Sequence, residues 1–226
     1  MKIKLLPIQM GGTIASVESA HGEGFSPGLS FNYLLHHMLE HSAELDQDFL
    51  ENFEIEQVIS PFGDDGLDSS QLQNHHIEYV ANIITTHYDD DDAFLVTHGT
   101  DTMANSAALL SFLLQGLDKP IILTGSQKTL CSPFHDVYSN LSNALKVVKH
   151  GIVGVWIVFG SYLFSGVRVT KVDTERLEAF ASNNHSAIPL KKIFTTPLPP
   201  QKAQKRKFYT QLSNEVEILY LSQNLR

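Results

Sequence analysis

The chain has 226 residues, a formal net charge of −9 at pH 7, 42% hydrophobic residues and one cysteine. The length suits one domain with a small appendage, and the negative charge argues against a nucleic-acid surface. The lone Cys131 excludes an internal disulfide framework and is compatible with a reducing compartment. No apolar run approaches the about 20 residues of a membrane helix, and the N-terminus lacks the apolar stretch of a signal peptide, so we expect a cytoplasmic protein without membrane partners.

Apolar runs alternate with segments of helical spacing along most of the chain. The predicted strands are residues 3–8, 54–59, 93–96, 121–123 and 152–159. Residues 70–88 and 103–117 place their apolar side chains on one helical face, and 136–148 also has helical spacing. This alternation is typical of an α/β domain, so we predict a three-layer fold built on a parallel sheet.

Three of the predicted strands lead into glycine loops with small polar residues. These loops are Gly11-Gly12-Thr13, His98-Gly99-Thr100-Asp101-Thr102 and Thr124-Gly125-Ser126-Gln127. Because the carboxyl ends of parallel strands meet at one edge of the sheet, Thr13 and Thr100 are expected to share a crevice. Each loop taken alone is also compatible with a plain strand-to-helix turn or a helix cap.

The C-terminal third contains a lone ammonium group and the clearest linker signal. Residues 167–171 form a β-rich stretch that ends at Lys171, and residues 195–200 are rich in proline. We therefore expect a domain over residues 1–195, a linker over 196–213 and a further strand within 214–226. The basic cluster at 202–207 is expected to be a solvated part of that linker, with an anion site as the alternative.

Five motifs in order resemble one known family. They are Gly11-Gly12-Thr13-Ile14-Ala15, Asp68-Ser69-Ser70, His98-Gly99-Thr100-Asp101-Thr102, Thr124-Gly125-Ser126-Gln127 and Arg168-Val169-Thr170-Lys171. The set is similar to the bacterial-type L-asparaginase (asparaginase/glutaminase) family, in its cytosolic type I branch, from about residue 2 to residue 180. The resemblance implies the N-terminal domain of that family, with most of its smaller second domain missing, and a homo-oligomer.

The resemblance also implies a reaction and assigns it to particular residues. Thr13 would attack the side-chain amide of L-asparagine, giving L-aspartate and ammonia. Thr100, Asp101 and Lys171 would form a companion triad, in which Lys171 accepts the Thr100 proton and Asp101 holds the lysine. A lysine can supply a base in this way because burial disfavours its charged form.

The remaining site residues would bind the substrate. Backbone N–H groups near Gly12 and Gly99 would stabilise the oxyanion. Ser69, with Asp68 or Ser70, would hold the α-carboxylate, and Asp101 would also meet the α-ammonium. The resemblance implies no metal and no organic cofactor.

The sequence departs from the family pattern at several points. Phe25 stands where the family has a lid tyrosine, and Tyr33 is the nearest other phenol. Met10 replaces a threonine, and Pro7 is expected to interrupt the first strand. With the second domain missing beyond a strand at 216–221, we keep a second hypothesis, which is a weak or inactive remnant that binds a small amino acid or a partner.

Other signals favour simpler interpretations. The acidic run 89–92 lacks the spacing of a calcium loop, and the histidine groups at 36, 37, 41, 75 and 76 lack the accompanying ligands of a zinc site. Cys131 with His135 is a weak candidate for a catalytic thiol, and residues 16–28 have the composition of a lid or of a mobile surface loop. A phosphate-binding role for Gly11-Gly12-Thr13 is disfavoured, because the lysine and serine of a P-loop are missing.

Overall fold

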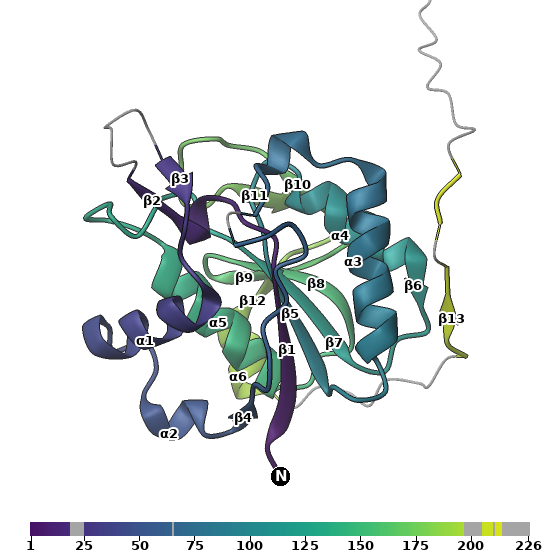
Figure 1. The fold of residues 1–226 in the computed structure, drawn as a ribbon, viewed down its shortest axis with the longest axis horizontal. Coiled ribbons are helices and arrows are strands. Elements are labelled where there is room, and N and C mark those ends of the chain that lie inside the picture. The colour runs from purple at the N-terminus through teal and green to yellow at the C-terminus, as the bar shows by residue number, and fades with distance from the viewer. Residues whose placement is uncertain (19–24, 65, 197–204, 210, 214–226) are drawn as a thin grey trace, which may run out of the picture.

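The protein is built on a seven-stranded sheet that is covered by helices on both faces (Figure 1). The structure, a computed structural model, describes residues 1–18, 25–64, 66–196, 205–209 and 211–213. The strand order is β12-β9-β8-β7-β5-β1-β4. The strands are β1 (Ile3–Gln9), β4 (Phe53–Glu54), β5 (Ala93–Thr97), β7 (Pro120–Thr124), β8 (Gly154–Phe159), β9 (Tyr162–Ser165) and β12 (Ile188–Pro189).

The sheet is parallel from β4 through β8, which confirms the predicted α/β fold. At the other edge β9 runs antiparallel to β8, and β12 runs antiparallel to β9. This change of direction follows from chain length, because two residues between β8 and β9 allow only a hairpin, whereas a parallel neighbour needs a long crossover.

The helices form the two outer layers. They are α1 (Phe31–His41), α2 (Gln47–Leu50), α3 (Asn74–His87), α4 (Met103–Leu113), α5 (Val137–Lys149) and α6 (Leu190–Thr195). Helices α1, α5 and α6 pack in one apolar cluster with Leu5, Leu95 and Ile122 of the sheet. Helices α3 and α4 pack in the other with alternate residues of the same strands, such as Leu6 and Phe94. Strands buried on both faces explain why their sequences are continuously apolar.

Three small two-stranded sheets and two 3₁₀ helices complete the described chain. They are β2 (Ser16–Glu18) with β3 (Phe25–Pro27), β10 (Val169–Lys171) with β11 (Phe180–Ser182), β6 (Leu114–Gln115) with β13 (Lys207–Phe208), and the helices η1 (Thr13–Ala15) and η2 (Ser69–Gln71). The predicted strand at 216–221 lies outside the described residues. Within them, no helix is long and apolar enough to cross a membrane.

Proline 7 does not interrupt the first strand as predicted. β1 is continuous, and Pro7 pairs with Leu95 in register. The Pro7 carbonyl accepts from the Ile59 N–H at 3.0 Å, and the Gln9 N–H donates to the Ile59 carbonyl at 2.8 Å. The backbone polar groups of residues 7 and 9 therefore point toward the side of β1 on which β4 lies. On that side, β1 has no strand partner between Glu54 and Ile59. The N–H that proline lacks falls in this gap, so no ladder bond with a central neighbour is lost.

Three predicted boundaries were wrong, each for a local reason. The strand expected at 54–59 is reduced to β4 and one bridge between Ile8 and Ile59. Helix α3 begins at Asn74 rather than 70, because the Gln73 N–H donates to the side chain of His76 and caps the helix there. Helix α4 ends at Leu113 rather than 117, because the next two residues pair with β13 and Gly116 adopts a φ of +69°.

Candidate active site

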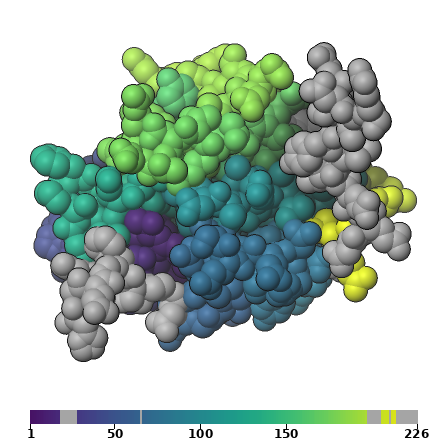
Figure 2. All heavy atoms as spheres, turned by 90° about the horizontal axis from the view of Figure 1, so that it is seen from above, coloured from purple at the N-terminus to yellow at the C-terminus, as the bar shows by residue number. Residues whose placement is uncertain are grey.

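Two of the glycine loops touch through their backbones at the carboxyl edge of the sheet. A β-carbon added to Gly12 would lie 2.3 Å from the Gly99 α-carbon, and Gly12 has a φ of +83°. Only glycine fits such a position, because L side chains rarely adopt this conformation and the space is filled. Thr13 and Thr100 directly follow these two glycines, so the structure brings the two predicted loops together. Seen from above, the purple N-terminal segment reaches the surface between the teal and the blue segments (Figure 2).

A third segment meets the same point. A β-carbon on Gly99 would lie 2.6 Å from the Ser69 Oγ, so the Ser69 side chain is directed at Gly99. Ser69 is buried, and its carbonyl accepts from the Thr102 hydroxyl at 2.7 Å. Asp68 accepts from the Ser70 N–H at 2.9 Å and caps η2. The carboxylate of Asp68 therefore shapes the turn that presents Ser69.

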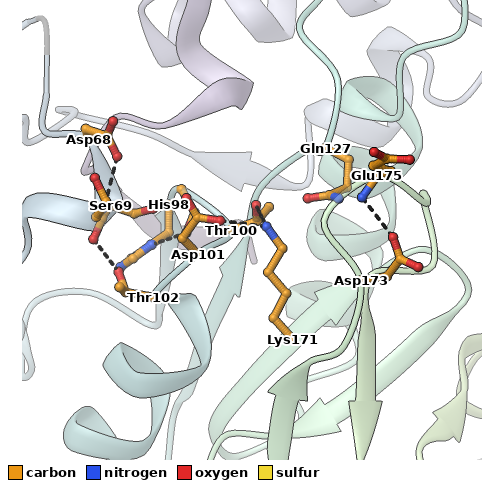
Figure 3. A network of polar contacts seen from close by, with 12 residues as sticks. Asp68, Ser69, His98, Thr100, Asp101, Thr102, Gln127, Lys171, Asp173 and Glu175 are labelled. Carbon is orange, nitrogen blue, oxygen red and sulfur yellow. Dashed lines mark hydrogen bonds and ion pairs between the residues drawn. The ribbon is translucent and has the colours of Figure 1, made fainter.

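Lys171 joins Thr100 and Asp101 (Figure 3). Its Nζ donates to Thr100 Oγ1 at 2.8 Å and to Asp101 Oδ1 at 2.7 Å. The Lys171 side chain is 13% exposed and that of Asp101 is 57% exposed, so the lysine is held inside while the carboxylate reaches the solvent. Three side chains predicted to act together are thus in direct contact, although 70 residues separate Lys171 from Asp101.

Lys171 comes from outside the central sheet, on the β10–β11 hairpin. The end of this hairpin is an ordered turn, in which Asp173 accepts from the backbone of Glu175 and Arg176. These N–H groups hold the pKa of Asp173 below its usual value. Gln127 of the third glycine loop donates its side-chain amide to the Arg176 carbonyl at 3.2 Å. The third loop therefore supports the turn that follows the lysine.

The third loop itself is held by two buried residues whose role the sequence did not predict. Asp136 accepts from the Gln127 and Lys128 N–H groups at 2.9 to 3.0 Å. Asn140 donates to Asp136 and to the Gly125 carbonyl, both at 2.9 Å. An aspartate and an asparagine four residues apart at the start of a helix could have indicated this network, since both side chains favour contacts with nearby backbone.

The predicted lid begins as a hairpin. β2 and β3 pair in register from Ser16 and Pro27 to Glu18 and Phe25. The Gly28 and Leu29 N–H groups both donate to the Ala15 carbonyl at 2.9 Å, which closes the base of the hairpin. Residues 19–24 and the side chain of Phe25 lie outside the described part. Tyr33, the other phenol considered, lies on α1 and is 47% exposed.

The other signals have structural explanations. Asp89 pairs with Arg206 at 2.8 Å, Asp91 lies 3.6 Å from His87, and Asp92 accepts from the Lys4 N–H. Asp89, Asp91 and Asp92 of the acidic run therefore each contact a different partner. Among the described residues, no group of three or more His, Cys, Asp or Glu side chains could hold a metal ion. Cys131 is exposed, and His135 packs edge-on against the ring of Tyr138.

The described site therefore places a hydroxyl and a carboxylate just after parallel strands of an α/β sheet, in contact with an amine from a neighbouring hairpin, which is an arrangement that can activate a nucleophile. The family profile described as Asparaginase, N-terminal, matches residues 4–196. The chain therefore belongs to the asparaginase family.

The chain is similar to several individual proteins. L-asparaginase 1 of Escherichia coli is 40% identical over 139 residues, covering 59% of this chain and 41% of the relative. The solved thermostable L-asparaginase from Thermococcus kodakarensis superposes with a TM-score of 0.76 at 28% identity, covering 93% of this chain and 61% of that one. The human 60 kDa lysophospholipase is 42% identical over 118 residues, covering 52% of this chain and 21% of the relative. The chain spans less than two thirds of each of these proteins.

Proposed function

We propose that this chain hydrolyses the side-chain amide of L-asparagine to L-aspartate and ammonia, with Thr13 as the nucleophile. The observation that carries the proposal is the contact of Lys171 Nζ with both Thr100 and Asp101, beside the point where Gly12 meets Gly99. Membership of the asparaginase family supports the same reaction class.

The proposed reaction proceeds through an acyl-enzyme. The Thr13 hydroxyl oxygen forms a bond to the amide carbon, the carbon–nitrogen bond breaks, and the Thr13 proton leaves on the departing ammonia. Water then cleaves the ester and restores the Thr13 hydroxyl. The proton travels through the triad: Thr100 takes the Thr13 proton while Lys171 accepts the Thr100 hydroxyl proton, and Lys171 then passes a proton to the departing nitrogen. Asp101 keeps the lysine in place.

Substrate binding is assigned to the segment around η2. Ser69 and the backbone of the 68–70 turn hold the α-carboxylate, while Asp101, which reaches the solvent, meets the α-ammonium. A homo-oligomer and a cytoplasmic location remain part of the proposal. Because Phe25 replaces a tyrosine in the lid, we expect turnover to be reduced.

The experiment measures ammonia released from millimolar L-asparagine by the purified chain. Thr13→Ala should abolish the release, whereas Thr86→Ala, on the exposed side of α3, should leave it unchanged. Equal release by the wild type and Thr13→Ala would overturn the proposed nucleophile. No release from the wild type, together with calorimetric binding of L-aspartate, would favour the second candidate, a remnant that binds a small amino acid.

A further inference from the structure

His98 lies close to Thr100 and Asp101 in the site (Figure 3). It is fully buried, and both of its ring nitrogens have a partner. Its Nδ1 lies 2.6 Å from the carbonyl oxygen of Gly99, and its Nε2 lies 2.8 Å from the hydroxyl of Ser106 on α4. The His98 backbone is fixed too, because its N–H donates to the Thr124 carbonyl at 2.9 Å. The ring is therefore held on two sides and cannot turn without losing hydrogen bonds.

The partners determine which ring nitrogen carries the proton. A carbonyl oxygen can only accept, so Nδ1 must donate to Gly99. Burial lowers the pKa of His98 to about 4, and the Gly99 carbonyl only partly opposes this effect. The ring is accordingly neutral at pH 7, and Nε2 accepts from the Ser106 hydroxyl. The contacts thus select the tautomer with the proton on Nδ1.

This bond fixes the orientation of the peptide between Gly99 and Thr100. A trans peptide is planar, and its C=O and N–H groups point in opposite directions. No cis peptide occurs among the described residues. Because the Gly99 carbonyl points to the His98 ring, the Thr100 N–H points away from it. Thr100 is 6% exposed, and within the described chain its N–H has no acceptor. A buried donor of this kind is normally satisfied by a partner, which can be a ligand.

We propose that His98 is a positioning residue, whose Nδ1–H holds the Gly99 carbonyl so that the Thr100 N–H faces the substrate carbonyl oxygen. The inference rests on the proposed function, because the negative charge that this N–H stabilises develops when Thr13 attacks the amide. A donor placed in advance for a developing oxyanion stabilises the transition state more than the bound substrate. Loss of the orientation should therefore lower kcat more than it raises KM.

Two near-isosteric substitutions separate the role of Nδ1 from that of the ring as a whole. In His98→Asn the side-chain amide nitrogen takes about the place of Nδ1, and in His98→Gln it takes about the place of Nε2. We expect His98→Gln to lower kcat by about 10²-fold with KM changed by less than about threefold. His98→Asn should keep kcat within about tenfold of the wild type. Equal losses in both variants, with circular dichroism showing both to be folded, would overturn the proposal.

A second measurement does not depend on turnover or on a variant that folds. Nitrogen-15 NMR of the wild-type chain at pH 7 should show His98 with Nδ1 protonated and Nε2 unprotonated. The opposite tautomer would overturn the role of His98 even if ammonia release is normal. If the wild type releases no ammonia, the proposed function fails, and the positioning role is decided by this spectrum and by titration with L-aspartate. The Thr100 amide signal should shift in that titration, and a signal that stays in place would overturn the role.

Discussion

The backbones of Gly12 and Gly99 are in contact, and this contact leaves no room for a side chain on Gly12. Gly12→Ala should lower the free energy of unfolding by about 1–2 kcal/mol from its left-handed conformation and by about 1–3 kcal/mol more from the clash. Gly63→Ala is the matched control, because Gly63 has nearly the same φ of +81° and nothing within 4 Å of an added β-carbon. Urea unfolding of the two variants measures their free energies of unfolding, and Gly12→Ala should be the less stable of the two. Equal values would show that the two loops do not touch.

Lys171→Met removes the ammonium that joins Thr100 to Asp101. We expect ammonia release to fall by about 10²-fold or more, the usual range for loss of a proton-transfer group. Folding should survive with a loss of at most about 1 kcal/mol, because Asp101 is largely exposed and can be hydrated. Lys191→Met, an exposed lysine on α6, is the control. Normal release by Lys171→Met would remove the lysine from the mechanism.

Stability should depend on pH through His98. Its folded-state pKa of about 4 lies below the unfolded value of 6.5, so the unfolded chain binds more protons between these values. The stabilising contribution is complete above pH 6.5 and is lost as the pH falls through 4, a change of about 3 kcal/mol in the free energy of unfolding. His37, His76 and His135 also have lowered pKa values and act in the same direction.

The measurement for this pH dependence compares wild type with His98→Asn by urea unfolding at pH 7 and pH 4. Subtracting the free energy of unfolding of one protein from that of the other cancels the contributions of the other histidines. The difference between them should shrink or reverse at the lower pH. A difference that is the same at both pH values would show that His98 is not buried as a neutral ring.

Phe25→Tyr restores a phenol to the predicted lid. We expect a higher kcat for ammonia release, because the hydroxyl can assist Thr13, the proposed nucleophile, when the lid covers the site. Tyr33→Phe serves as the control, since Tyr33 lies on α1 outside the hairpin. A kcat for Phe25→Tyr equal to or below that of the wild type would show that Phe25 does not limit the chemistry.

Local sequence predicted the central part of the fold. The strands could be located because burial on both faces leaves a continuous apolar run, and the amphipathic helices α3 and α5 because burial on one face leaves a helical period. The end of α4 could not, since β6 exists only because it pairs with β13, more than 90 residues later. The effect of Pro7 was also misjudged, because it depends on which neighbour the missing N–H would face.

The candidate site was predictable to a different extent for each residue. Strand-end glycine loops indicated Thr13 and Thr100, and chain order indicated that they share an edge. Lys171 has no local signal, and only the resemblance to a family connected it to Asp101. The sequence does not predict a role for His98, because its two partners are a neighbouring carbonyl and a serine eight residues away. Such a role depends on the ring's orientation, which a sequence pattern does not contain.

The position of Lys171 on a separate hairpin makes this chain suitable for a fragment-complementation sensor. Gly151 lies in an exposed turn between α5 and β8, with nothing within 4 Å of an added β-carbon. A break there would leave Thr13, Thr100 and Asp101 on one polypeptide and Lys171 on the other. With the proposed activity, the amount of ammonia released would report how many of the two fragments have associated, so the association of proteins fused to the fragments could be measured by a colorimetric assay.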